Sequence, residues 1–144
     1  MKKIKAAVIG VGNIGSIHTE IYSSLENVDL TAVCDIDQEK ADKAASKFNC
    51  KAFYSVESLL AEMPMEIASV CTKGEENGGD HYLPTVQLLE AGIHVLGEKP
   101  ISNNIEHARL MTKLAEEKQV RYGINLNHRF TPSAIKAKEW VDAN

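Results

Sequence analysis

Short apolar runs alternate along this chain with longer stretches in which apolar residues recur every three or four positions. The short runs are typical of buried parallel strands, and the longer stretches are typical of helices that pack one face on a sheet. The runs predict strands at residues 4–9, 30–34, 52–54, 67–71, 94–96 and 122–125. Because strands and helices alternate through residues 1–144, the pattern predicts one α/β domain with a doubly wound, mainly parallel six-stranded sheet.

Helix boundaries are predicted from residues with known capping or terminating preferences. In chain order these are Asn13 and Asp37 at helix starts, Pro64 and Gly92 at helix ends, Ser102 or Asn103 as a cap, and Pro132 at the start of the last helix. Inward-facing side chains are expected at helical spacing. They are Ala41, Ala44, Ala45 and Phe48, then Tyr82, Val86 and Leu89, then Ile105, Ala108, Met111 and Ala115.

The first predicted strand runs into three glycines, Gly10, Gly12 and Gly15. The first permits a tight turn, the second lets a pyrophosphate approach the backbone, and the third lets the following helix pack close to the strand. Phosphates then bind the unpaired N–H groups at the helix N-terminus. Since this GxGxxG follows a strand and opens a helix, it favours a dinucleotide site in a Rossmann fold over an ordinary turn.

An acidic residue, Asp35, lies about 20 residues after Gly15, the usual offset for a carboxylate that binds the adenosine ribose hydroxyls. A carboxylate there repels a 2′-phosphate, and neither Ile36 nor Asp37 offers an arginine that would bind one. The sequence therefore predicts NAD as cofactor in preference to NADP. The alternative for Asp35 is a solvated strand end or a helix N-cap.

Composition excludes several other classes of protein. The chain is 44% hydrophobic with a net charge of −4, and it has no block of lysine and arginine, so we expect no nucleic-acid partner. No apolar run approaches a membrane span, and the basic N-terminus leads into a strand rather than a signal peptide, so we expect a cytoplasmic protein with no membrane partner. Cys34, Cys50 and Cys71 are widely spaced, which predicts reduced thiols and no metal site.

Further candidates follow predicted strands at their carboxyl ends, where open parallel sheets bind ligands. Lys99, in Glu98-Lys99-Pro100, is either a solvated loop residue or a group that reaches the nicotinamide and a substrate hydroxyl, where burial would favour its proton-accepting form. Its bond to Pro100 is a candidate cis peptide. Arg129 either contacts an anion or braces a loop, and His81 either faces the cofactor or sits at a helix N-terminus.

The chain resembles the Gfo/Idh/MocA oxidoreductases, a family named after glucose–fructose oxidoreductase and inositol dehydrogenase. The matching segments are residues 10–18, 34–35, 70–72, 90–100 and 127–132, of which residues 91–100 are the most specific. The resemblance implies that Lys99 helps to place the nicotinamide and the substrate and joins a proton relay, and that Glu98 and Thr72 line the cofactor cleft. It does not make His18 catalytic; His18 is expected to be packed or exposed, and His94 to be structural.

The resemblance implies hydride transfer between NAD and a secondary alcohol on a sugar, inositol or similar polyol, assisted by a general base. Lys99 is the candidate catalytic residue. The candidate cofactor-binding residues are Gly10, Gly12, Asn13, Ile14, Gly15, Asp35, Ile36, Cys71, Thr72, His81, Glu98, Lys99 and Arg129. One alternative is a non-catalytic nucleotide-binding or sensing module. Another is an S-adenosylmethionine-dependent methyltransferase, against which the third glycine and the Glu98-Lys99-Pro100 segment argue.

Two departures from the family pattern shape the expectation. The loop at residues 73–80 is longer than usual and lacks the family's proline, so we interpret it as a glycine-rich flap. Family enzymes also carry a C-terminal α/β domain that binds substrate and forms the oligomer interface, whereas this sequence stops at Asn144. We therefore expect the cofactor domain of a longer, homo-oligomeric enzyme, with little turnover alone and with apolar surface exposed near Phe130 and Trp140.

Overall fold

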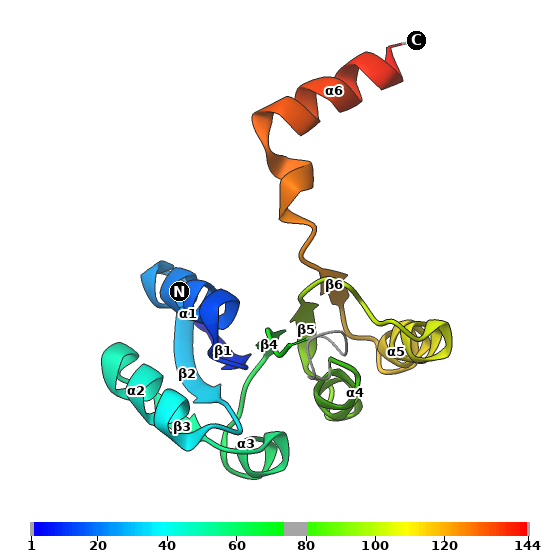
Figure 1. The fold of residues 1–144 in the computed structure, drawn as a ribbon. Helices are drawn as coiled ribbons and strands as arrows, with labels where there is room; N and C mark the ends of the chain where they lie inside the picture. The colour runs from blue at the N-terminus through cyan, green and yellow to red at the C-terminus, as the bar shows by residue number, and fades with distance from the viewer. Residues whose placement is uncertain (1, 74–80, 144) are drawn as a thin grey trace.

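The computed structural model describes residues 2–73 and 81–143, and most of them form a layered α/β domain (Figure 1). The strands are β1 Ile4–Ile9, β2 Val28–Cys34, β3 Lys51–Phe53, β4 Ile67–Val70, β5 His94–Gly97 and β6 Tyr122–Ile124. The helices are α1 Asn13–Ser24, α2 Gln38–Phe48, α3 Val56–Glu62, α4 Tyr82–Glu90, α5 Ile105–Glu117, the short 3₁₀ helix η2 Asn127–Phe130 and α6 Pro132–Asp142. Apart from Lys73, the predicted flap lies outside the described residues.

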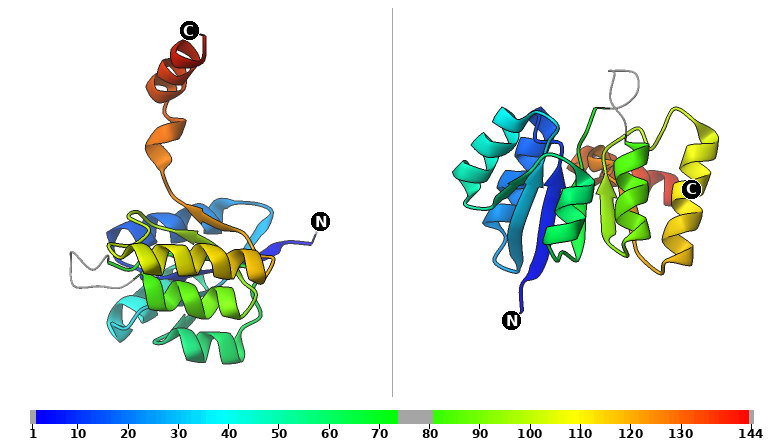
Figure 2. Two further views of the ribbon diagram at one scale, coloured as in Figure 1. Left: turned by 90° about the vertical axis from the view of Figure 1, so that its right-hand side faces the viewer. Right: turned by 90° about the horizontal axis from the view of Figure 1, so that it is seen from below.

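All six strands are parallel and lie in the order β3-β2-β1-β4-β5-β6, so the predicted doubly wound sheet is confirmed. Helices α1 and α2 lie on one face of the sheet, and α3, α4 and α5 lie on the other (Figures 1 and 2). Alternate residues of β1 serve the two faces, as strand geometry requires. Ala7 and Ile9 join the core beneath α3 to α5, whereas Val8 joins the smaller core beneath α1 and α2.

Most of the predicted boundaries are confirmed within one or two residues. Asp37 caps α2 by accepting a hydrogen bond from the backbone N–H of Lys40, and Pro132 is the first residue of α6. Gly92 follows α4 at φ +78°, with backbone bonds from Gly92 to Leu89 and from Ile93 to Leu88. This bond pair is the Schellman motif, in which a left-handed glycine ends the helix.

The predicted cap of α5 is wrong. Asn104, not Ser102 or Asn103, is the N-cap, and its Oδ1 accepts from the N–H groups of Glu106 at 2.8 Å and His107 at 3.4 Å. Ser102 Oγ instead accepts a hydrogen bond from the backbone N–H of Asn104 at 3.0 Å, in the turn that precedes the helix.

One predicted inward-facing residue needs correction. Ile105, in the first turn of α5, is 63% exposed, whereas Met111 and Ala115 further along the same helix are buried. The predicted face of α4 is confirmed: Leu89 is fully buried, and Tyr82 and Val86 are partly buried against the same core.

The chain leaves β6 through η2 and α6, which project away from the sheet and its helices (Figure 2). Neither segment has a buried residue. Phe130 is 76% exposed and Trp140 is 65% exposed, so the predicted apolar surface in this region is confirmed. None of the described helices combines the length and the apolar character that crossing a bilayer requires.

Candidate functional site

The candidate residues gather at the carboxyl edge of the sheet, around the point where β1 and β4 lie side by side. The connections from β1 and from β4 lead to helices on opposite faces, which opens a crevice there in sheets of this type. Cys71, Glu98 and Asn125 follow β4, β5 and β6, and each donates its backbone N–H to the last carbonyl of the neighbouring strand, over 2.7, 2.9 and 2.8 Å. The strand ends therefore form one hydrogen-bonded rim beside the glycine loop.

Two of the loop glycines are required by close packing. Gly10 has φ +83°, and a Cβ on it would lie 2.7 Å from the backbone nitrogen of Thr72. A Cβ on Gly15 would lie only 1.7 Å from the carbonyl oxygen of Gly10 and 3.3 Å from the Cβ of Cys71. These two positions therefore let the start of α1 seat directly on the end of β1 and the segment after β4.

Gly12 differs from both, because a Cβ on it would meet no described atom within 4 Å. Its φ of −66° is one that any residue adopts, so the backbone does not need glycine there. Gly12 is also the N-cap of α1, and among the described residues no side chain caps that helix. Asn13 and Ile14 are exposed residues in the first turn of α1, where the helix leaves its N–H groups without partners. Together with the open space at Gly12 this is the environment that a pyrophosphate requires, so the loop fits a dinucleotide.

Asp35 fixes the other side of this loop. One carboxylate oxygen, Oδ2, accepts from the backbone N–H of Val11 at 2.8 Å, and the other, Oδ1, accepts from the N–H of Asp37 at 3.0 Å. The helix-cap alternative is excluded, since Asp37 caps α2. Each oxygen retains a lone pair for a further donor, such as a ribose hydroxyl. Ile36 is 92% exposed beside it.

The segment after β4 joins Thr72 to His81. The hydroxyl of Thr72 lies 3.0 Å from Nδ1 of His81, which is buried at the N-terminus of α4. His81 thus lies at the helix N-terminus, and its contact with the cofactor stays a prediction. The neighbouring thiol is buried as well: burial, and secondly the charge of Glu98, raises the pKa of Cys71 to about 12. Cys71 is therefore a protonated packing residue at this edge.

Lys99 and Arg129 lie further out. Lys99 is exposed, so the described residues do not supply the burial that its proton-accepting role would need. The candidate peptide bond between Lys99 and Pro100 is cis. Arg129 is exposed on η2, outside the rim formed by the strand ends. The cofactor contacts of both residues stay predictions.

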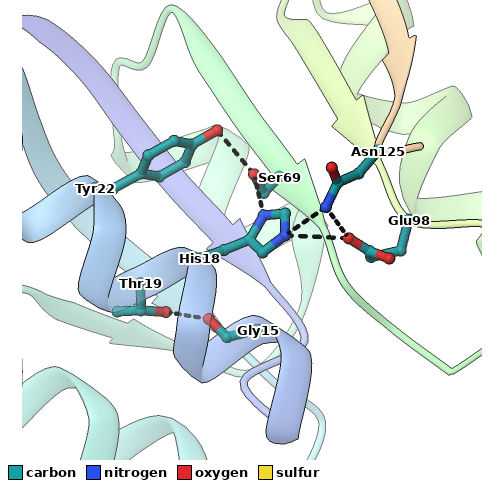
Figure 3. A network of polar contacts seen from close by, with 7 residues as sticks. All are labelled: Gly15, His18, Thr19, Tyr22, Ser69, Glu98 and Asn125. Atoms are coloured by element: carbon teal, nitrogen blue, oxygen red, sulfur yellow. Dashed lines mark hydrogen bonds and ion pairs between the residues drawn. The ribbon is translucent and has the colours of Figure 1, made fainter. Parts of the chain in front are cut away.

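A buried polar network lies directly behind the rim (Figure 3). His18 from α1 contacts Ser69 Oγ through Nδ1 at 3.0 Å and Glu98 Oε1 through Nε2 at 3.1 Å. Tyr22 reaches Ser69 at 2.8 Å, and Nδ2 of Asn125 donates to the same oxygen of Glu98 at 2.6 Å. Of the two positions expected for His18, packed or exposed, the structure shows the packed one.

This network was not predicted from the sequence. Two signals were present: His18 and Tyr22 are four residues apart and therefore share one face of α1, and Ser69 interrupts an otherwise apolar strand. Neither signal names a partner, because the partners lie on strands far away in the sequence.

Comparison with known proteins agrees with this geometry. A family model described as an oxidoreductase family with an NAD-binding Rossmann fold, Gfo/Idh/MocA, matches residues 4–126. UDP-N-acetylglucosamine 3-dehydrogenase of Acidithiobacillus ferrooxidans is 31% identical over 133 residues, which are 92% of this chain and 40% of that enzyme. Glucose-6-phosphate 3-dehydrogenase of Bacillus subtilis is 35% identical over 133 residues, which are 90% of this chain and 35% of that enzyme.

A solved structure is similar as well. GenD2 from gentamicin A biosynthesis, in complex with NAD, superimposes with a TM-score of 0.89 at 27% identity, covering 97% of this chain and 39% of that one. Across the curated relatives that it matches most significantly, the present chain spans 35% to 41% of their length.

Proposed function

Since this chain belongs to the Gfo/Idh/MocA family of oxidoreductases, we propose that residues 1–144 are the NAD-binding domain of a dehydrogenase acting on a secondary alcohol. The observation that carries the proposal is the geometry around Gly12. Open space in front of an uncapped helix N-terminus lies beside a carboxylate that is fixed by the backbone of the same loop. This arrangement offers phosphate-binding N–H groups and a ribose-binding oxygen together.

The proposed substrate is a sugar, inositol or similar polyol. Relatives of the chain include dehydrogenases of a UDP-sugar, a D-glucoside, glucose 6-phosphate and inositols, all of which carry secondary hydroxyls. When bound, NAD supplies the hydride acceptor for oxidation of such an alcohol. The chain's own contribution is to bind and orient the dinucleotide and to present Lys99, an exposed cation, beyond the end of β5.

The substrate-binding surface of the whole enzyme is part of the proposal. Because the chain spans about two fifths of its relatives, we expect substrate contacts, further acid–base groups and homo-oligomer contacts to come from outside residues 1–144. Residues 1–144 alone are then expected to bind NAD with little turnover.

A preference for NAD over NADP is supported by how Asp35 is held. Two backbone N–H groups bind its two oxygens, so the carboxylate cannot turn away from a 2′-phosphate without losing both hydrogen bonds. The next residue, Ile36, is exposed and offers no positive charge. A phosphate placed there would meet a fixed negative charge.

Calorimetric titration with NAD, NADP and S-adenosylmethionine tests the function. We expect NAD to bind at least tenfold more tightly than NADP. Asp35→Ala should reduce the ratio of the two affinities by weakening the binding of NAD. The matched control is Asp29→Ala, which removes the same charge from the other end of β2 and is expected to leave NAD affinity within twofold. Binding of none of these ligands by the unmodified chain, or tighter binding of S-adenosylmethionine than of NAD, would contradict the proposal.

A further inference from the structure

The buried network joins the glycine-loop helix to the segment that carries Lys99. His18 lies three residues after Gly15 on α1 and is 7% exposed, and Glu98, 8% exposed, directly precedes Lys99 (Figure 3). The contact of 3.1 Å between them spans 80 residues of sequence. One end of α1 therefore faces the proposed phosphate site, while a side chain on its next turn holds the end of β5.

The proton positions in this network follow from its acceptors. Glu98 Oε1 accepts from Asn125 Nδ2 at 2.6 Å, and the same oxygen is the natural acceptor for an Nε2–H of His18. The 3.3 Å separation between Asn125 Nδ2 and His18 Nε2 is then a contact between two donors that share one oxygen.

The other ring nitrogen completes the chain. With Nε2 protonated in a neutral ring, Nδ1 of His18 accepts from the hydroxyl of Ser69, which in turn accepts from Tyr22. Burial raises the pKa of the Tyr22 hydroxyl, which keeps it a protonated donor. Every donor then points the same way, from Tyr22 through Ser69 and His18 to Glu98, and such chains strengthen one another in a buried setting.

Glu98 needs these donors because a buried carboxylate is costly unless it is hydrogen-bonded. His18 and Asn125 supply two bonds to it, and its backbone N–H is held by the last carbonyl of β4. Removing one donor would weaken the hold on the carboxylate and let Glu98 move, together with Lys99 and Pro100, which follow it at the carboxyl edge of the sheet.

We propose that His18 is a positioning residue, which acts through Glu98 to hold the segment 98–100 against the nicotinamide half of the bound dinucleotide. The proposal rests on the proposed NAD-binding function. The adenosine and pyrophosphate half is held by the glycine loop and Asp35, which the His18–Glu98 contact does not include. Loss of His18 therefore weakens recognition of one half of the ligand and spares the other.

Titration with NAD and with ADP-ribose separates the two halves, because ADP-ribose lacks only the nicotinamide ring. In His18→Ala we expect NAD to bind about tenfold more weakly, the order of one charge-assisted hydrogen bond, while ADP-ribose affinity stays within twofold. His18→Gln places an N–H donor near the same oxygen and is expected to recover most of the loss. Tyr22→Phe removes only the outer end of the network and should weaken NAD binding less than His18→Ala does, with ADP-ribose affinity unchanged. The matched control is Glu20→Ala, which alters an exposed side chain of the same helix outside the network and should leave both affinities unchanged.

A second variant keeps the test independent of folding. Asn125→Ala removes the other donor to Glu98 at a half-buried position and is expected to give the same selective loss of NAD affinity. If the His18 and Asn125 variants lost affinity for NAD and for ADP-ribose to the same extent, the network would have a purely structural role, and the proposal would be overturned.

Equal affinity of the unmodified chain for NAD and ADP-ribose would also overturn the proposal. The nicotinamide would then contribute nothing to binding, and segment 98–100 would have no contact with it to hold in place. Failure of the unmodified chain to bind either ligand would instead refute the proposed function on which the inference rests.

Discussion

Alanine substitution at two glycines of the same motif is expected to have opposite consequences. At Gly12 an added methyl group meets open space, and φ is −66°. At Gly15 an added methyl group would lie 1.7 Å from the carbonyl oxygen of Gly10, a backbone atom that no side-chain rotation can move. Gly12→Ala therefore tests whether the open space at Gly12 is needed for ligand binding. Gly15→Ala tests whether α1 can still pack on the loop.

The magnitudes follow from these environments. Gly→Ala at a compatible backbone position stabilises a protein by about 0.4–1 kcal/mol because the unfolded chain loses freedom. Because Gly12 is also the N-cap of α1, where alanine is disfavoured by a similar amount, Gly12→Ala is expected to leave Tm within roughly 2 °C. Gly15→Ala forces the helix away from the loop and should cost about 3 kcal/mol or more, which lowers Tm by roughly 6–12 °C.

Binding of NAD should respond differently from stability. The new methyl group in Gly12→Ala occupies the space through which a pyrophosphate would approach, and overpacking of about 1–3 kcal/mol weakens binding roughly 5- to 150-fold. Thermal unfolding followed by circular dichroism and titration with NAD measure the two quantities on the same samples. Unchanged NAD affinity in Gly12→Ala, or an unchanged Tm in Gly15→Ala, would refute the assignment of roles.

Three further predictions concern other parts of the molecule. Asn104→Ala should lower the free energy of unfolding by about 1 kcal/mol through loss of the α5 cap, and Asn104→Ser should restore most of it; equal urea midpoints for both variants would contradict this. Burial raises the pKa of Cys34 and of Cys71 from 9.0 to about 12, so the folded state retains protons that the unfolded state loses, and the free energy of unfolding should fall between about pH 9 and pH 12. The measurement is the urea midpoint between about pH 9 and pH 12, compared with that of the Cys34→Ala, Cys71→Ala double variant. If the two midpoints depended equally on pH, this reasoning would be refuted. Exposed apolar side chains on η2 and α6, including Phe130 and Trp140, should cause weak self-association, which a single monomeric species across a wide concentration range in sedimentation would disprove.

Features that depend on neighbours in sequence were predictable from the chain alone. The glycine spacing, the distance to Asp35, the cap at Asp37 and the helix end at Gly92 are all set within a few residues or by one strand and one helix. The α5 start was predicted less well, because three adjacent residues, Ser102 to Asn104, all have cap-forming side chains and only the path of the turn selects among them.

The polar network could not be predicted in the same way. His18, Ser69, Glu98 and Asn125 become neighbours only because β4 inserts beside β1 and is followed across the sheet by β5 and β6. Likewise, the exposure of Ile105 depends on where α5 meets the sheet, which helical periodicity alone does not specify. Long-range sheet order, rather than local propensity, determines these features.

The contact between Gly15 and the Gly10 carbonyl also bears on the thermodynamics of ligand binding. With Asp35 hydrogen-bonded to Val11 on the opposite side, the glycine loop, which we propose binds phosphate, is held between β1, β2 and α1. Its conformational entropy is lost when the domain folds, and little is left to lose on association. The loop thus meets an incoming pyrophosphate preorganised, with its amide dipoles already aligned.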